Sequence, residues 1–397
     1  MEINSSTSLR INGERGRTIK NLKKAAARIS AAIKNKENII LYGDADLDGV
    51  TALIILEETI RNLGGELPVV YFPDREKEGY GISEIGLNYF KKISPALLIV
   101  LDLGIGNFEE VKLAKKFGFK VLIIDHHEIL DRLPGAEIIV NPKQKGDKYP
   151  FKNFATVGIV FKLSELLLKK NLTENLRKNF LELTALATIA DMMPRKGENQ
   201  IFIEDGLKSI ENSWRPGIQA LFNEEQFKNY SNLNQKVSKI ISLLNVRDVE
   251  NNLPASFRLL TSPDLEKSKK LIGKLIEKSK IRRQKIEETI QEIEERINRR
   301  AQPIIFEGDS LWDFTLISSV ASIICRRHQK PTFIYKIIKD ESQGTVRVPA
   351  GIDSVALMKK CSKYPIIYGG HPSASGFRIK NENLEKFKEC LISRFKQ

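Results

Sequence analysis

Residues 43–49 read Gly-Asp-Ala-Asp-Leu-Asp-Gly, so three alternating carboxylates directly follow the apolar run Ile39-Ile40-Leu41-Tyr42. The apolar run is typical of a buried strand. Residues 50–56 contain no helix breaker, and we expect a helix there. The acids are therefore predicted to lie at the carboxyl end of a strand, where open α/β sheets place their sites. Carboxylates this close repel one another unless a cation such as a divalent metal lies between them; the alternative is an acidic loop that caps the helix.

Two further apolar runs end in the same kinds of side chain. Residues 96–101 end at Asp102, and residues 120–124 end at Asp125-His126-His127. Near-continuous apolar runs are typical of parallel strands that are covered on both faces. Because such strand ends converge on one crevice of a doubly wound sheet, the three sets of polar residues are expected to meet. A strongly apolar helix over 179–189 then leads to Asp191, whose alternative role is a helix cap.

Composition narrows the possible functions. The chain has 397 residues, which favours two domains, and a net charge of +14, which favours a polyanionic partner such as nucleic acid. Charge alone is weak evidence, since basic residues also line solvated helices. Cys325, Cys361 and Cys390 suggest neither a metal-binding pair nor a disulfide framework, which predicts a reducing compartment and a cytoplasmic protein. The sequence has no signal-peptide core and no run that could span a bilayer, so no membrane association is expected.

The second half of the chain predicts a separate domain. Residues 265–300 are highly charged with a narrow apolar stripe, typical of a helix that bridges two domains or, alternatively, forms a coiled-coil dimer. Beyond it, strands are expected at 303–306, 332–335 and 344–348, with a helix at 316–327. A glycine-rich turn at 369–373 could offer backbone N–H groups to an anion. In the first half, Arg75 and Tyr80 could clamp a phosphate and stack on a base, with an ordinary polar loop as the alternative.

The ordered motifs resemble those of the DHH phosphoesterase family with its DHHA1 domain, and within it the RecJ-type single-strand-specific exonucleases. The motifs that carry the resemblance are Asp44 to Gly49, Asp102-x-Gly104, Asp125-His126-His127, Asp191 and Gly369-Gly370-His371. The resemblance spans the chain from about Arg17 to its C-terminal end. It implies an α/β fold in which a parallel-sheet DHH domain (1–264) is joined by a long helix (265–300) to a smaller α/β DHHA1 domain (301–397). The active site is then expected in the cleft between the two domains.

The resemblance also implies a phosphodiesterase that uses two Mn²⁺ or Mg²⁺ ions. The residues that match the family's metal ligands are Asp44, Asp46, Asp48, Asp102, His126 and Asp191, with Asp102 as the bridge. His127 matches the residue that contacts the scissile phosphate, and Asp125 is expected to orient the histidines; with Asp102 they form the expected catalytic set. The residues that match substrate-binding positions are Arg75, Tyr80, Arg347, Gly369, Gly370, His371 and Ser373.

The function implied is an exonuclease that degrades single-stranded DNA to 5′-mononucleotides from the 5′ end, in DNA repair, recombination and replication. DNA is favoured over RNA, replication or repair proteins are candidate partners, and the oligomeric state stays open. The alternatives are an oligonucleotide or cyclic-dinucleotide phosphodiesterase, and a non-catalytic replication scaffold. Two departures from the RecJ pattern bear on strand affinity. Val346-Arg347-Val348 lacks the hydroxyls of a Ser-Arg-Ser segment, and the sequence ends too soon after Gly376 for an oligonucleotide-binding barrel.

Overall fold

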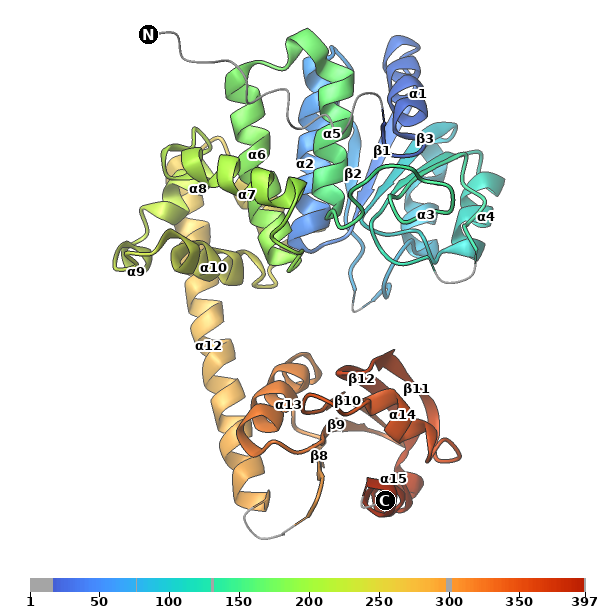
Figure 1. Cartoon of the computed structure of the whole chain (residues 1–397), viewed down its shortest axis with the longest axis vertical. Coiled ribbons are helices and arrows are strands. Elements are labelled where there is room, and N and C mark those ends of the chain that lie inside the picture. The colour runs from blue at the N-terminus through green and yellow to red at the C-terminus, as the bar shows by residue number, and fades with distance from the viewer. Residues whose placement is uncertain (1–16, 76, 130–131, 298–301, 396–397) are drawn as a thin grey trace. The chain divides into compact units, whose positions relative to one another are not determined.

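The computed structural model describes residues 17–75, 77–129, 132–297 and 302–395. The chain divides into two compact units, Met1–Ile276 and Glu277–Gln397 (Figure 1). The boundary falls inside helix α12 (Leu265–Ile297), which contributes residues to both units. The predicted helix was longer, but its last three residues lie outside the described residues.

The first unit is built on a five-stranded sheet in which every strand pair is parallel. Its strand order is β2-β1-β3-β4-β5. The strands are β1 (Asn38–Gly43), β2 (Val69–Tyr71), β3 (Ala96–Leu101), β4 (Lys120–Ile124) and β5 (Ile138–Val140). This is a doubly wound order in which the winding reverses between β1 and β3, and ligands bind at that switch point. The predicted parallel α/β sheet is confirmed.

Both faces of this sheet are covered, as the continuous apolar runs predict (Figure 1). Neighbouring side chains of a strand point to opposite faces, so Leu41 and Tyr42 belong to separate cores. The Leu41 face packs against α1 (Leu22–Lys34), α2 (Leu47–Asn62) and α5 (Thr156–Leu168). The Tyr42 face packs against α3 (Glu84–Phe90) and α4 (Phe108–Lys116).

A helical layer completes the first unit. Its elements are α6 (Glu174–Ala190), α7 (Glu198–Ser209), α8 (Pro216–Phe222), α9 (Glu225–Lys228), α10 (Leu233–Leu244), β6 (Val249–Glu250), β7 (Leu253–Pro254) and α11 (Ala255–Leu260). Arg215 ties this layer to α2, because its buried guanidinium pairs with Glu58 at 2.8 Å and donates to Asn179 at 2.5 Å. A buried charge that is fully paired in this way fixes the position of the layer without leaving an unsatisfied ion.

The second unit holds a five-stranded mixed sheet with the order β11-β12-β10-β9-β8. Its strands are β8 (Ile305–Asp309), β9 (Thr332–Ile338), β10 (Glu341–Arg347), β11 (Pro365–His371) and β12 (Ala374–Lys380). One face packs against α14 (Ser354–Lys359) and α15 (Leu384–Phe395) around Phe333. The other packs against α13 (Phe314–His328) and α12 around Ile334. The predicted second α/β domain is confirmed, but the expected glycine-rich turn is wrong. Residues 369–371 lie in strand β11, because they pair with β12, and the turn is confined to Pro372 and Ser373.

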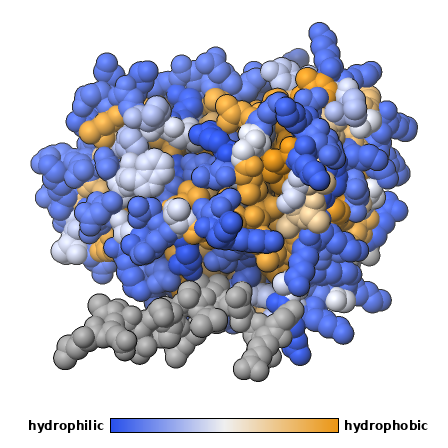
Figure 2. Space-filling view, turned by 90° about the horizontal axis from the view of Figure 1, so that it is seen from above, coloured by the Kyte–Doolittle hydropathy of each residue, from blue (hydrophilic) through white to orange (hydrophobic). Residues whose placement is uncertain are grey.

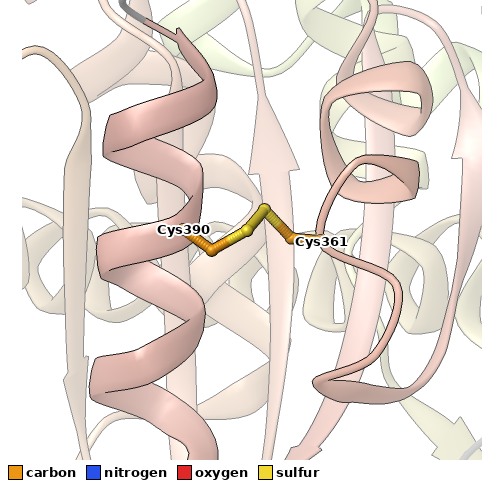
Figure 3. The surroundings of a disulfide bond; sticks show 2 residues. All are labelled: Cys361 and Cys390. Atoms are coloured by element: carbon orange, nitrogen blue, oxygen red, sulfur yellow. A yellow bond between two sulfur atoms is a disulfide. The ribbon is translucent and has the colours of Figure 1, made fainter.

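The prediction that the cysteines form no disulfide is also wrong. Cys361 and Cys390 are bonded, with their Cα atoms 6.0 Å apart (Figure 3). Their separation of 29 residues gave no signal, but α14 and α15 cover the same sheet face and bring the two side chains together. Because disulfides are rare in reducing compartments, the cysteine pattern no longer supports a cytoplasmic location. Cys325 is a free, buried thiol.

Helix α12 contributes apolar residues to the cores of both units. Ile272 and Leu275 of α12 belong to the large core of the first unit, and Ile290 and Ile293 to a core of the second. The face drawn in Figure 2 is mostly hydrophilic, with apolar side chains showing between the charged ones. Among the residues that the structure describes, no helix combines the length and apolar character needed to cross a membrane.

Candidate metal centre

Asp46 and Asp48, two of the acids that follow β1, lie in different environments. Asp46 is the N-cap of α2 and accepts hydrogen bonds from the backbone N–H groups of Asp48 and Gly49, both at 3.1 Å. Asp48 is 3% exposed and accepts from the N–H groups of Thr156 at 2.7 Å and Val157 at 2.8 Å. These two amides open helix α5, whose amino end favours negative charge. Asp46 thus caps α2 through its Oδ1 atom, which leaves its other carboxylate oxygen available as a ligand, while Asp48 faces the interior.

The turn after β1 requires its last glycine. A Cβ atom on Gly49 would lie 2.4 Å from the backbone oxygen of Asp44, a distance that real Cβ atoms do not reach. Asp102, at the end of β3, has a positive φ of 64°. Aspartate tolerates this conformation better than most residues. The Asp102 carboxylate is 2% exposed and accepts from the Thr156 hydroxyl at 2.9 Å, so Thr156 holds two predicted ligands, Asp102 through its hydroxyl and Asp48 through its backbone N–H.

Three predicted carboxylate ligands converge on the imidazole of His126, which is itself a predicted ligand. Its Nε2 atom lies 3.4 Å from Asp102 Oδ1, 3.4 Å from Asp191 Oδ2 and 3.9 Å from Asp48 Oδ2. Asp191 reaches the group from the carboxyl end of α6, as predicted. These side chains come from positions up to 143 residues apart (191 − 48), and the sheet's switch point brings them together.

The donor atoms could hold more than one cation. Three sets of side chains place their ligand atoms within 4.8 Å of one another: Asp44, Asp46 and Asp102; Asp48, His126 and Asp191; Asp102, His126 and His127. Asp102 and His126 each belong to two of the sets, and of the two only the carboxylate has two oxygens with which to bridge two cations. Among the described residues, the buried atoms His126 Nδ1 and Asp191 Oδ2 have no hydrogen-bond partner. Carboxylate oxygens with an imidazole nitrogen suit Mn²⁺ or Mg²⁺, so the residues present fit a divalent ion.

The electrostatics of the cluster also favour a cation. Burial, with the nearby Asp191 and Asp46, raises the pKa of Asp48 to about 8. Burial and the neighbouring acids, Asp48 first, raise the pKa of Asp102 well above its usual range. Burial lowers the pKa of His126 to about 4, so this imidazole is neutral and can act as a ligand. Positive charge at the cluster would offset the repulsion among these carboxylates.

His127 differs from its neighbour in both partner and charge. Asp125 Oδ1 lies 2.8 Å from His127 Nδ1, and this hydrogen bond raises the pKa of His127 to about 9. Burial raises the pKa of Asp125, but the bonds and charge of His127 outweigh it and the net pKa is lowered. Asp125 thus holds a protonated imidazole whose Nε2 atom stays free to donate. Asp125 contacts His127 in this way but not His126, whose Nδ1 atom has no hydrogen-bond partner among the described residues, so its role in orienting both histidines stays a prediction.

Arg75 lies inside the acid cluster. Its guanidinium donates to both oxygens of Asp44, at 3.0 and 2.5 Å, and reaches Asp46 at 3.1 Å. The ring of Tyr80 lies 4.8 Å from the Arg75 guanidinium carbon and is 79% exposed. Arg75 thus pairs with two candidate ligands, and its predicted role as a phosphate clamp stays a prediction.

Two cavities open on the cluster. One of about 410 Å³ is lined by Asp46, Asp48 and Asp191 on one side, and by residues 244–249 and 254–256 on the other. A second, of about 680 Å³, contains Asp44, Asp102 and His127, with residues 103–108 as a wall. Sequence reasoning found no chemistry in residues 244–256. The sequence feature that could have indicated a site there is the pair of polar residues Asn245 and Arg247, which follow a helix with an apolar stripe.

The predicted strand-binding residues lie in the second unit. Arg347 ends β10 and donates to the hydroxyls of Ser318 at 2.6 Å, Ser322 at 3.1 Å and Thr345 at 2.9 Å. Within the described part of the chain it has no carboxylate partner, and burial lowers its pKa. The hydroxyls missing beside Arg347 in the sequence are thus supplied by helix α13, which sequence reasoning did not identify. Gly369, Gly370 and His371 lie in β11, and Ser373 is exposed in the turn.

Comparison with known proteins agrees with this architecture. Residues 38–188 match the DHH family, N-terminal domain. This match covers the part of the chain that holds the first three motifs, and it agrees with the resemblance that they carry. Among its relatives is the single-stranded-DNA-specific exonuclease RecJ of Bacillus subtilis, 32% identical over 380 residues, a match that covers 94% of this chain. RecJ of Thermus thermophilus is 28% identical over 387 residues and 95% of the chain.

The chain spans only part of these relatives, 47% of the Bacillus protein and 55% of the Thermus protein. A crystal structure of exonuclease RecJ bound to manganese superposes with a TM-score of 0.79 at 25% identity, and the match covers 95% of this chain and 94% of that one. The likeness extends over both units, so the two-domain fold class is that of RecJ.

Proposed function

We propose that the chain is a metal-dependent exonuclease that hydrolyses single-stranded DNA to 5′-mononucleotides, with 5′→3′ polarity, in DNA repair, recombination or replication. The observation that carries the proposal is the convergence of Asp48, Asp102, His126 and Asp191 at the sheet's switch point. RecJ relatives and a manganese-bound RecJ structure support the choice of reaction and metal. We expect the enzyme in the cytoplasm, where its DNA substrate and candidate repair or replication partners are found.

The proposed metal ligands are Asp44, Asp46, Asp48, Asp102, His126 and Asp191. Two Mn²⁺ or Mg²⁺ ions held there would supply positive charge that polarises the phosphate and activates water for attack. His127, held by Asp125, donates a hydrogen bond from Nε2 to the scissile phosphate. Thr156 keeps Asp102 in place through its hydroxyl and Asp48 through its amide. Arg75 and Tyr80 bind the substrate at the rim of the cluster, with Arg75 moving from Asp44 to a phosphate.

The second unit is proposed to bind the strand. Arg347 carries a half-buried positive charge whose described partners are neutral hydroxyls and the backbone carbonyl of Val346, which suits a phosphate. Gly369, Gly370, His371 and Ser373 are proposed to complete this phosphate site.

A digestion time course tests the function. The full chain with Mn²⁺ is given end-labelled single-stranded DNA, the matching RNA and a dinucleotide in parallel. We expect stepwise loss of nucleotides from the 5′ end of the long DNA, and none with EDTA. Cleavage of the dinucleotide alone would indicate a small-substrate phosphodiesterase instead, and cleavage of nothing would indicate a scaffold.

A further inference from the structure

One half of the second sheet is open beyond the predicted phosphate site. In β10, Ser342, Gly344 and Val346 face the Phe333 core, so Gln343 and Thr345 point to the opposite face. In antiparallel pairs, directly opposed residues share a face. The following residues therefore line that face beside Arg347: Gln343 and Thr345 of β10, Gly376 and Arg378 of β12, and Ile367 and Gly369 of β11.

The middle of this face carries no side chains, because glycines occupy it. We call Gly369 and Gly376 the floor. A Cβ atom added to Gly369 would meet nothing within 4 Å, and one on Gly376 would meet only the Gly344 oxygen, at 3.4 Å. The opposite side of the sheet is full, because a Cβ on Gly344 would lie 2.5 Å from the Phe377 ring. A cavity of about 350 Å³ lies over the floor, with Gln343, Ile367 and Arg378 on its walls.

Positive charge stands at both ends of the floor. Arg347 lies in register with Ala374, and Arg378 with Gln343, four residues further along the strands. Four residues span about 14 Å, which an extended nucleic-acid strand covers in a few nucleotides. The Arg378 side chain is 47% exposed, and its Nε atom is 3.4 Å from the Glu341 carboxylate, which is 45% exposed. An exposed pair at this distance is weak, so a phosphate can compete for Arg378.

We propose that this open face is a two-point binding site for a single nucleic-acid strand. One phosphate binds Arg347, a later phosphate binds Arg378, and the nucleotide between them lies over Gly369 and Gly376. The exposed side chain of Ile367, 58% accessible, contacts the sugar or base of the strand. The inference rests on the proposed function and adds Arg378, Gly376 and Ile367 to the residues that bind the substrate.

Binding measurements test the second point. The full chain in EDTA is titrated against fluorescent oligothymidylate by anisotropy at several salt concentrations. Arg378→Ala should weaken binding about tenfold, and should lower the slope of log K against log salt by about 0.7. Glu341→Gln should tighten binding, because it releases Arg378. Lys386→Ala, which removes an exposed charge from α15 on the other face, is the matched control and should change neither quantity.

A second variant tests the floor. Gly376→Val fills the floor without a backbone clash, so its melting temperature should match the wild type while strand affinity falls. Lys386→Ala should also digest single-stranded DNA at the wild-type rate, because this residue lies on the other face of the sheet. If the wild type digests DNA and Arg378→Ala binds it with unchanged affinity and salt slope, the inference is wrong and the proposed function stands. A wild-type chain that neither binds nor digests the strand overturns both.

Discussion

The two sheets of this protein use their strands in opposite ways. In the first, polar residues are concentrated at the strand ends, and Asp48, Asp102 and His126 are each at most 5% exposed. In the second, polar residues lie along an open face, where Arg378 remains 47% exposed. The first arrangement fixes donor atoms through backbone amides and a shared threonine, and the second presents long side chains to solvent. Metal chemistry needs ligands at fixed positions, whereas holding a charged polymer requires only accessible charge.

The largest expected effect is on hydrolysis, and it comes from a buried carboxylate of the first unit. Asp102→Ala should reduce Mn²⁺-dependent hydrolysis by about 10³-fold or more, because it removes the carboxylate common to two donor sets. Strand affinity and the circular-dichroism spectrum should be unchanged. Glu109→Ala, an acid 73% exposed on α4, is the control and should be fully active. Substantial activity in Asp102→Ala would exclude the bridging role.

Reduction of the disulfide should affect the second unit alone. Replacing Cys361 and Cys390 by serine should lower that unit's free energy of unfolding by about 3 kcal/mol, because the cross-link closes a loop and so lowers the conformational entropy of the unfolded chain. Thermal unfolding of the variant and of the wild type with and without dithiothreitol measures the effect. An equal loss of stability in the unfolding transition of the first unit would contradict the expectation that the two units unfold independently.

Metal addition should raise the thermal stability of the first unit alone. Mn²⁺ at about 100 times its dissociation constant should stabilise the unit by about 2.7 kcal/mol. EDTA should reverse this, and Asp48→Asn should abolish most of it. The shift is followed by differential scanning calorimetry. A metal shift confined to the second unit's transition would place the ions elsewhere.

The phosphate site should show a smaller effect, and on binding alone. Arg347→Ala should weaken single-strand binding by about 2 kcal/mol, the contribution of a charged hydrogen bond, while the turnover rate at saturation stays near wild type. His371→Ala should behave in the same way. A pure turnover defect at unchanged affinity would argue against strand binding by either residue.

The smallest expected effect concerns the hydroxyls that position Arg347. The double variant Ser318→Ala/Ser322→Ala should weaken strand binding by about 1 kcal/mol, because Arg347 loses two hydrogen-bond partners but keeps its charge. The salt slope should therefore be unchanged, unlike in Arg347→Ala. A changed slope would indicate that the serines contact the strand themselves.

The sequence by itself determined the main elements and the candidate metal ligands. The alternating acids after residue 43 and the apolar runs before Asp102 and Asp125 are local patterns, and local patterns encode strands, helices and their order. Once the strands are parallel and doubly wound, their carboxyl ends meet at one edge, so the convergence of Asp48, Asp102 and His126 followed from topology alone.

Only the tertiary structure decided which residues contact and orient the predicted site residues. The orientation of Asp48 and Asp102 by Thr156, the pairing of Arg75 with Asp44, and the disulfide join positions far apart in the chain. The serines that hold Arg347 and the strand position of Gly369 arise in the same way. Such contacts depend on how helices and strands pack against one another, and no periodicity in the sequence records that packing.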